Sequence, residues 1–303
     1  MKKFLLKLFL WFVPIIGLHL FLGSFAGGNT DSFYKRFTSP QQSNLILGNS
    51  RAAQGVRPEF LQATNGEKFY NYSFTIFDSP YGEAYFKSIE KKLNPDTKNG
   101  NFIVTVDPWS ISINKENPNE MLEKDLMIGK TKFNNMNPNY EYLIKNYHNS
   151  WFSLYQTRDE LYKSKMYLND DGWLEINITF DTKEEYEKNV QEKVNAYQKY
   201  TQDYILSQER VNWLEKTILF LQKHGKVILV KLPQGEKIHA IEKGYMPEFS
   251  QLMHTLSQKH QIKFLDYSEA GNQYQYVDGN HLQKDSGKEF TKKVNDSLKK
   301  YFK

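Results

Sequence analysis

Short apolar runs alternate with amphipathic stretches through most of the chain after residue 43. Such runs are typical of strands in a parallel sheet, because helices cover both faces and no polar alternation is needed. We predict strands at 44–47, 68–71, 102–106, 227–230 and 262–266. Strands that alternate with helices predict an α/β fold, here a three-layer α/β/α arrangement with a five-stranded parallel sheet.

The stretches between these runs carry helix signals. Residues 51–61 are predicted to hold a turn and a short helix, and Asp78 or Ser79 can cap a helix that runs to about residue 93. The apolar spacing of 3.6 residues predicts the remaining helices. They lie at about 181–224, with one break before Leu206, at 247–260 and at 286–301.

The start of the chain has a different character. Lys2 and Lys3 precede an apolar run over about 4–23, which only Lys7 and His19 interrupt. About 20 apolar residues can cross a bilayer as a helix, and lysines on the N-terminal side favour a cytoplasmic N-terminus. We therefore predict a membrane anchor, with the rest of the chain on the extracytoplasmic (periplasmic) side.

A cleaved signal peptide is the alternative for this segment, residues 1–26. Ser24-Phe25-Ala26 has the small-x-small pattern of a cleavage site. The apolar run is longer than the core of a usual signal peptide, which favours an uncleaved anchor. Both alternatives place the body of the chain outside the cytoplasm.

The remaining chain divides into a linker at 27–43 and a domain at 44–303. Within this domain, residues 111–181 are rich in Asn, Lys and Tyr and show little periodicity, which predicts an insertion, or cap region, over the mouth of the sheet. Asp170-Asp171-Gly172 predicts a hairpin turn inside it. The aromatic residues of the insertion can contact carbohydrate or form a small internal core; they include Trp151, Phe152, Tyr155 and Trp173.

Composition excludes several classes of function. The net charge of +5 comes from scattered lysines, so we predict no nucleic-acid partner. The chain has 0 cysteines, which excludes disulfides, thiol-zinc sites and a thiol nucleophile. The histidines lack paired metal-ligand spacing and no glycine-rich phosphate loop is present, so neither a metal nor a cofactor is expected.

The first predicted strand ends in Gly48-Asn49-Ser50. In open α/β sheets, ligands bind at the carboxyl ends of the strands. A serine at this position can present its hydroxyl above the sheet, or it can simply cap the next helix. Ser50 is therefore a candidate nucleophile, provided that a base can take its proton.

A candidate base lies near the other end of the chain, in Asp278-Gly279-Asn280-His281. A histidine held in one tautomer by a carboxylate is the usual base for a serine. The spacing of Asp278 and His281 lets the carboxylate reach one ring nitrogen while the other stays free. A polar surface turn is the alternative for this motif alone.

Together, these two motifs resemble the SGNH (GDSL-like) hydrolase superfamily. The chain looks most like its membrane-anchored bacterial branch, which is related to the D-alanine transfer protein DltD and to the alginate and peptidoglycan O-acetylation proteins. The resemblance implies Ser50 as nucleophile, His281 as base and Asp278 as its orienting group. It also implies an acyl-ester or cell-envelope glycan substrate, and a membrane-bound acyltransferase as a possible partner.

The blocks between these motifs depart from the family pattern. Asn49 replaces the usual aspartate, and Ser73, in Tyr70-Asn71-Tyr72-Ser73, stands where a glycine N–H serves the oxyanion. Asp107 follows the third strand without the asparagine that usually donates to the oxyanion. A missing donor typically costs about 10²–10³ in rate.

Four residues are candidates for the oxyanion hole or for substrate contact: Asn71, Ser73, Asp107 and Lys231. Asp107 can orient an active-site side chain or cap the turn at Pro108. Lys231 can attract an anionic group or remain a solvated rim lysine.

The sequence thus predicts an exported, membrane-tethered serine esterase or O-acyltransferase with a Ser-His-Asp triad. The alternative is a catalytically weak pseudoenzyme that serves as a glycan-binding or scaffolding subunit of an envelope-modification complex.

Overall fold

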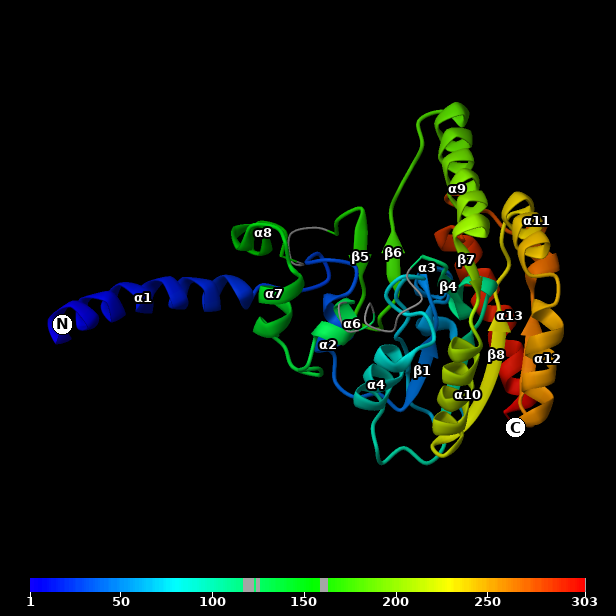
Figure 1. The fold of residues 1–303 in the computed structure, drawn as a ribbon, viewed down its shortest axis with the longest axis horizontal. Coiled ribbons are helices and arrows are strands. Elements are labelled where there is room, and N and C mark those ends of the chain that lie inside the picture. Colours follow the sequence, from blue (N-terminus) through cyan, green and yellow to red (C-terminus); the bar gives the residue numbers. More distant parts are fainter. Residues whose placement is uncertain (117–122, 124–125, 159–162, 303) are drawn as a thin grey trace.

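The computed structural model describes residues 1–116, 123, 126–158 and 163–302. Its centre is a five-stranded sheet in the order β2-β1-β3-β8-β9, in which every neighbouring pair is parallel (Figure 1). The predicted α/β fold with five parallel strands is therefore confirmed. The strands are β1 (Asn44–Leu47), β2 (Phe69–Asn71), β3 (Gly100–Thr105), β8 (Gly225–Lys231) and β9 (Lys263–Asp266).

Helices cover both faces of this sheet, which is why the middle of its central strands is a continuous apolar run, at residues 45–47 in β1, 102–104 in β3 and 227–230 in β8. One face packs against α4 (Glu83–Lys92), α10 (Gln208–Gln222) and α12 (Phe249–Lys259). The other face packs against α3 (Ser50–Gly55) and α13 (Lys284–Tyr301). Alternate residues of one strand enter the two cores, so that Leu45 and Leu47 lie in the first and Ile46 in the second.

The N-terminal helix α1 (Lys2–Gly23) projects away from the sheet (Figure 1). Among the described residues it is the one helix long and apolar enough to cross a membrane, and it is almost wholly exposed. This agrees with the predicted membrane-spanning segment. The helices α2 (Tyr34–Thr38), α7 (Tyr140–Asn146) and α8 (Trp151–Gln156) connect its end to the body.

The aperiodic region at 111–181 contains several short elements. They are β4 (Ser112–Asn114), α6 (Met127–Lys130), α7, α8 and the antiparallel hairpin of β5 (Met166–Leu168) and β6 (Leu174–Ile176). The hairpin turn predicted at Asp170-Asp171-Gly172 is present, and Gly172 adopts a φ of +80°. β4 pairs with β7 (Tyr204–Leu206), which interrupts the long helical stretch where a break was predicted.

Two long helices border the carboxyl edge of the sheet. α9 (Lys183–Asp203) begins after Thr182, whose side chain caps it, as predicted. The helix predicted at 247–260 is confirmed as α12, whereas α11 (Glu236–Tyr245) precedes it and was not predicted. Its inward face carries Glu242, which is 1% exposed, and this buried charge interrupts the apolar periodicity. Short 3₁₀ turns complete the chain: η1 (Pro58–Phe60), η2 (Pro108–Ile111) and η3 (Ser268–Gln273).

Candidate active site

The turn after β1 places Ser50 at the carboxyl edge of the sheet, as the first residue of α3. Gly48 has a φ of +145°, and a Cβ there would lie 1.8 Å from the Thr105 side chain, so only glycine fits. Asn49 caps α3, because its side-chain oxygen accepts a hydrogen bond from the Arg51 backbone N–H at 3.1 Å. Ser50 itself is half-buried.

A continuous hydrogen-bonded chain joins Ser50 to the loop before α13. The Nε2 atom of His281 lies 2.9 Å from the Ser50 hydroxyl oxygen. The Nδ1 atom of the same ring lies 2.9 Å from the Asp278 carboxylate. Residues 231 positions apart in the sequence therefore meet in the arrangement that a base-activated serine requires.

The loop itself holds this geometry. One Asp278 oxygen accepts hydrogen bonds from the backbone N–H groups of Asn280 and His281, at 3.0 and 2.9 Å. The other oxygen is then directed at the imidazole. Gly279 makes the turn with a φ of +79°, in the left-handed region that glycine tolerates.

The carboxylate of Asp278 is ionised at neutral pH. Burial alone raises its pKa, but the imidazole of His281 and the ammonium of Lys193, at 3.1 Å, outweigh that effect. The net result is a pKa well below the ordinary value for aspartate. An ionised carboxylate fixes the proton of His281 on Nδ1 and leaves Nε2 as the acceptor for the serine proton.

Arg51 links the nucleophile turn to three other segments. Its Nε donates to Asn280 at 2.8 Å, and Nη2 lies 2.6 Å from Glu242 of α11. Nη1 lies 3.6 Å from Asp107. Burial lowers the pKa of this guanidinium, but Glu242 and Asp107 more than offset it, so the pKa is raised. The Nε bond fixes the Asn280 amide with its nitrogen 3.3 Å from His281 Nε2.

Asp107 caps the turn at Pro108, one of the two roles that the sequence left open, and also contacts the nucleophile turn. It caps η2, because it accepts the backbone N–H of Ser110 at 2.9 Å. Its second oxygen accepts a hydrogen bond from the Asn49 side chain at 2.5 Å. Asp107 thus supports the residue that precedes Ser50, and it stands behind the nucleophile turn.

Asn71 and Ser73 have partners inside the protein. The Asn71 amide donates to the carbonyl oxygens of Ala52 and Val56, both at 2.8 Å, and so closes the end of α3. The Ser73 backbone N–H donates to the Asn71 side chain at 3.2 Å. Both side chains are fully buried. In this conformation neither group is available to an oxyanion.

Lys231 also lies apart from the triad. Its ammonium lies 5.1 Å from the centre of the Phe249 ring, on the α12 side of the sheet, and the residue is 6% exposed. It lowers the pKa of Asp266, whose hydrogen bonds to Ser250 and Ser268 act in the same direction against burial. Lys231 is therefore not a solvated rim lysine; it is buried beside Phe249 and Asp266.

One backbone donor remains at the nucleophile. Among the described residues, the Ser50 N–H has no hydrogen-bond acceptor, as expected in the first turn of a helix. This N–H is therefore a candidate donor to an oxyanion that forms on a carbonyl attacked by Ser50. No group of three His, Asp or Glu side chains that could hold a metal is present in the part of the chain that the structure describes.

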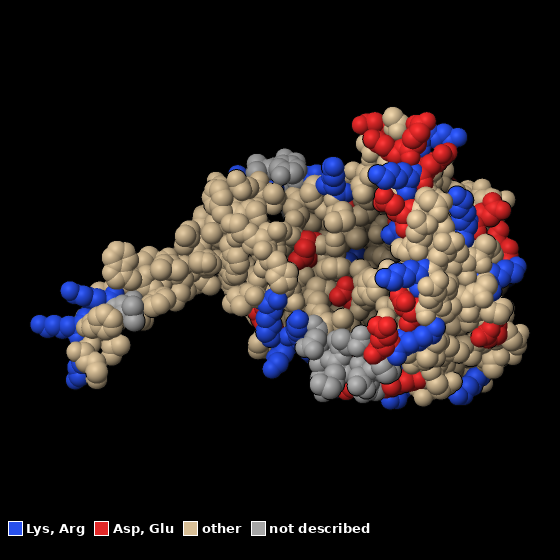
Figure 2. Space-filling view, turned by 45° about the horizontal axis from the view of Figure 1, so that its top comes forward, with Lys and Arg blue, Asp and Glu red and all other residues tan. Residues whose placement is uncertain are grey.

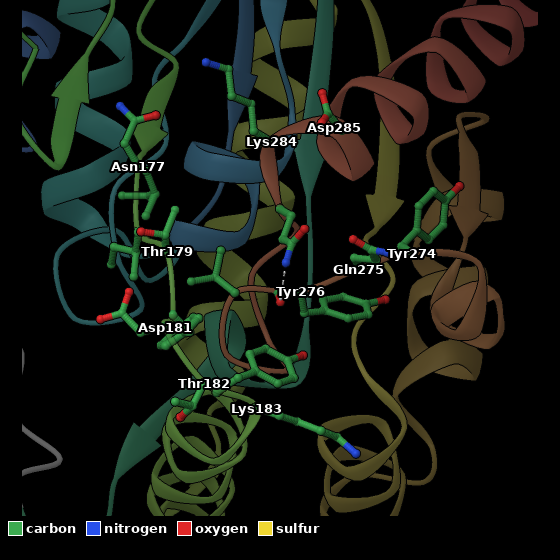
Figure 3. A pocket seen from close by; sticks show the side chains of 16 residues that line it. Asn177, Thr179, Asp181, Thr182, Lys183, Tyr274, Gln275, Tyr276, Lys284 and Asp285 are labelled. Atoms are coloured by element: carbon green, nitrogen blue, oxygen red, sulfur yellow. Dashed lines mark hydrogen bonds between the residues drawn. The ribbon is translucent and has the colours of Figure 1, made fainter.

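A cavity of about 900 Å³ opens beside the histidine loop (Figure 3). The segment between β6 and α9 forms one wall, and residues 274–277 with 283–285 form the other. Its lining includes Val277, next to Asp278, but neither Ser50 nor His281. Tyrosine rings alternate there with amide and charged groups, so it suits a polar ligand with ring faces.

The sequence did not reveal three of the residues that support the triad. Arg51 and Lys193 belong to amphipathic stretches in which a charge normally faces solvent, and their partners lie far away in the chain. Asn280 lies inside the predicted motif, but its contact to Arg51 needs the fold. The position of Arg51 directly after the serine was the available signal. The insertion's aromatic candidates lie elsewhere: Trp151 against α1, and Trp173 against α3.

No protein-family model and no curated protein matches the chain. Among solved structures, it is similar to a Streptococcus pneumonia protein provisionally assigned as a platelet activating factor, with a TM-score of 0.42, 11% identity, and coverage of 90% of this chain and 89% of that one. It is also similar to an inhibitor-bound aryl esterase of M. Smegmatis, with a TM-score of 0.36, 10% identity, and coverage of 86% and 100%. Similarity at this level assigns no chemistry, so function has to be inferred from the site.

Proposed function

We propose that this protein is a serine ester hydrolase or O-acyltransferase of SGNH type. The observation that supports this proposal is the hydrogen-bonded chain from Asp278 through His281 to Ser50, with both bonds at 2.9 Å. The resemblance of the Gly48-Asn49-Ser50 and Asp278–His281 motifs to that superfamily points to the same chemistry.

In the proposed reaction, the Ser50 oxygen attacks the acyl carbonyl while His281 Nε2 takes the hydroxyl proton. The Ser50 N–H stabilises the resulting oxyanion. His281 then gives its proton to the leaving alcohol, and the acyl group remains on Ser50. A second alcohol or water attacks this ester and loses its proton to His281; the bond between the Ser50 oxygen and the acyl carbon then breaks, and His281 returns the proton to the serine. Water gives an esterase, and a sugar hydroxyl gives a transferase.

We further propose a tethered, extracytoplasmic setting with a cell-envelope glycan or polymer as substrate. The apolar helix α1 and its preceding lysines support the tether. The cavity beside the histidine loop is the proposed place for the polymer. Three tyrosines line it, Tyr186, Tyr274 and Tyr276, together with amides and charges of both signs. Such a surface can stack on sugar rings and bond their hydroxyls.

One observation favours the alternative, a glycan-binding or scaffolding subunit with weak catalysis. The two family positions that usually complete the oxyanion hole carry Ser73 and Asp107, whose polar groups are engaged inside the protein. With the Ser50 N–H as the remaining donor, the rate is lowered by about 10²–10³ for each missing donor relative to a complete hole.

Serine reactivity distinguishes these two functions. The full chain in detergent is treated with a fluorophosphonate probe, alongside Ser50→Ala, His281→Ala and the matched control Ser73→Ala. Catalysis predicts labelling of the wild type and of Ser73→Ala, and loss of labelling in the other two variants. A folded wild type that stays unlabelled at high probe concentration counts against the hydrolase and favours the binding subunit.

A further inference from the structure

The end of the body nearest α1 is apolar, and α7 and α8 form it. Figure 1 shows α7 and α8 beside the last turns of α1, on the side of the body closest to the N-terminus. In the space-filling view the middle of this end is mostly tan, with Lys and Arg side chains at its edges, and acidic and basic side chains gather most densely over the opposite part of the molecule (Figure 2).

The sequence explains why charge is sparse at the middle of this end. The charges of α7, Glu141 and Lys145, pair with each other, and Arg158 lies over the Tyr155 ring at the edge of this end. Residues 146–157, which include all of α8, contain no Asp, Glu, Lys or Arg, although such residues make up 25% of the chain. The segment also presents large apolar groups to the outside. Phe152 is 54% exposed, Tyr155 is 37% exposed, and Ile144 of α7 is 74% exposed.

Contacts to α1 fix where these helices sit along its axis. Tyr140 donates a hydrogen bond to the Leu20 carbonyl at 2.7 Å. The Trp151 ring lies 5.1 Å from the His19 ring, and Tyr155 lies 5.1 Å from Phe25. Trp151 and Tyr140 also stack on each other. The tryptophan and tyrosines of this region therefore surround the end of α1.

The length of α1 indicates how deep in the bilayer the neighbouring helices α7 and α8 would lie. The hydrocarbon core is about 30 Å thick, and a helix of 22 residues spans about 33 Å at 1.5 Å per residue. Nearly all of α1 is needed to cross, so its last turns lie at the membrane surface. Trp and Tyr are enriched at that level because their rings have an apolar body and a polar edge.

We infer that α7 and α8 form a membrane-docking surface, which inserts Ile144, Phe152 and Tyr155 into the interface of the bilayer that α1 crosses. The occupant of this apolar face is lipid, because the face continues directly from the membrane helix. Docking would hold the body at a fixed orientation and distance from the membrane. This inference rests on the membrane tether proposed above.

The absence of cysteine permits a direct test with single labelled positions. The full chain is placed in nanodiscs of phosphatidylcholine and phosphatidylglycerol, with a nitroxide spin label on Phe152→Cys or Ile144→Cys. Phe12→Cys in α1 reports on the tether. Leu219→Cys on α10 is the matched control, since it is an apolar residue that is 44% exposed on the body. The measured quantity is the ratio of collision rates with oxygen, which concentrates in lipid, and with a water-soluble nickel chelate.

We expect the labels at 12, 144 and 152 to collide more with oxygen, and the label at 219 to show the reverse. A lipid-like ratio at 12 with a water-like ratio at both 144 and 152 would overturn the docking surface and leave the tether intact. A water-like ratio at 12 would overturn the tether and the docking surface together. Exposed side chains tolerate these substitutions, and circular dichroism checks the fold of each variant.

Discussion

The two sides of Ser50 are built differently. On the proton-transfer side, His281 and Asp278 are aligned on the hydroxyl, and Lys193 and the loop N–H groups hold the carboxylate ionised. On the side where an oxyanion would form, two of the candidate groups named from the sequence are used for structure. Asn71 closes the end of α3, and Asp107 supports Asn49.

For the proposed reaction, this difference separates two requirements, a base that activates the serine and donors that stabilise the oxyanion. The base increases the reactivity of the serine nucleophile, whereas the oxyanion donors stabilise the transition state. A site that has the base but few oxyanion donors is expected to keep a reactive serine and to turn over its ester substrate more slowly. The following variants separate the two sides.

Asp278→Asn is expected to have the largest effect on activity. The amide of asparagine cannot hold the His281 proton on Nδ1 as the carboxylate does, so Nε2 is no longer a base. In a serine triad this change lowers the rate by about 10⁴, and we expect that loss in fluorophosphonate labelling. The thermal unfolding temperature serves as the control for folding. A loss below tenfold would mean that the proton-transfer side does not operate.

Arg51→Met is expected to have the largest effect on stability. It leaves Glu242 and Asp107 buried without their counter-charge, and breaking a buried pair costs about 3–5 kcal/mol. Urea unfolding measures this loss. The double variant with Glu242→Gln should recover part of it, because one uncompensated charge is removed. As a control, Lys87→Met breaks an exposed pair with Glu83 and should cost less than about 1 kcal/mol.

The sequence predicted the central sheet because that part of the fold depends on local signals. The strands are short apolar runs, and both faces of each are covered. Glu242 shows the limit of this reasoning. It lies buried on α11, where Trp109 and Gln234 donate to it and Arg51 neutralises it. A local sequence pattern cannot show that a charged side chain is buried when its partners come from three other segments. Helix α11 was missed for that reason.

Some residues of the candidate site could likewise be identified from local motifs, whereas the roles of others depended on the fold. Ser50, Asp278 and His281 could be identified because each motif has a recognisable spacing, and the fold only had to bring the two motifs together. The assignments of Asn71 and Ser73 depended on the direction in which each polar group points. That direction follows from the neighbouring α3 carbonyls, which the sequence does not place.

Asn71→Ala tests the oxyanion side directly. If the amide is structural, as its two bonds to α3 indicate, its loss leaves the Ala52 and Val56 carbonyls without a buried donor and costs about 1–3 kcal/mol. The labelling rate of the folded variant should then change by a small factor. A loss of about 10²–10³ in rate without lost stability would instead identify Asn71 as an oxyanion donor. Ser73→Ala, which keeps its N–H, should change neither quantity.

Lys193→Met gives the smallest expected effect and tests the support of the carboxylate. The lowered pKa of Asp278 means that its contribution to stability is complete above the unfolded pKa of about 3.9. That contribution is lost as the pH falls through the lower folded-state pKa. Removing Lys193, which is 32% exposed, should therefore cost about 1 kcal/mol or less at pH 7. The difference between wild type and variant in urea unfolding should stay constant down to about pH 4 and shrink only at lower pH, as the pH falls through the lowered folded-state pKa of Asp278 and protonation removes the ion pair. A difference that stays constant with pH would show that Lys193 acts through packing of α9 and not through the charge of Asp278.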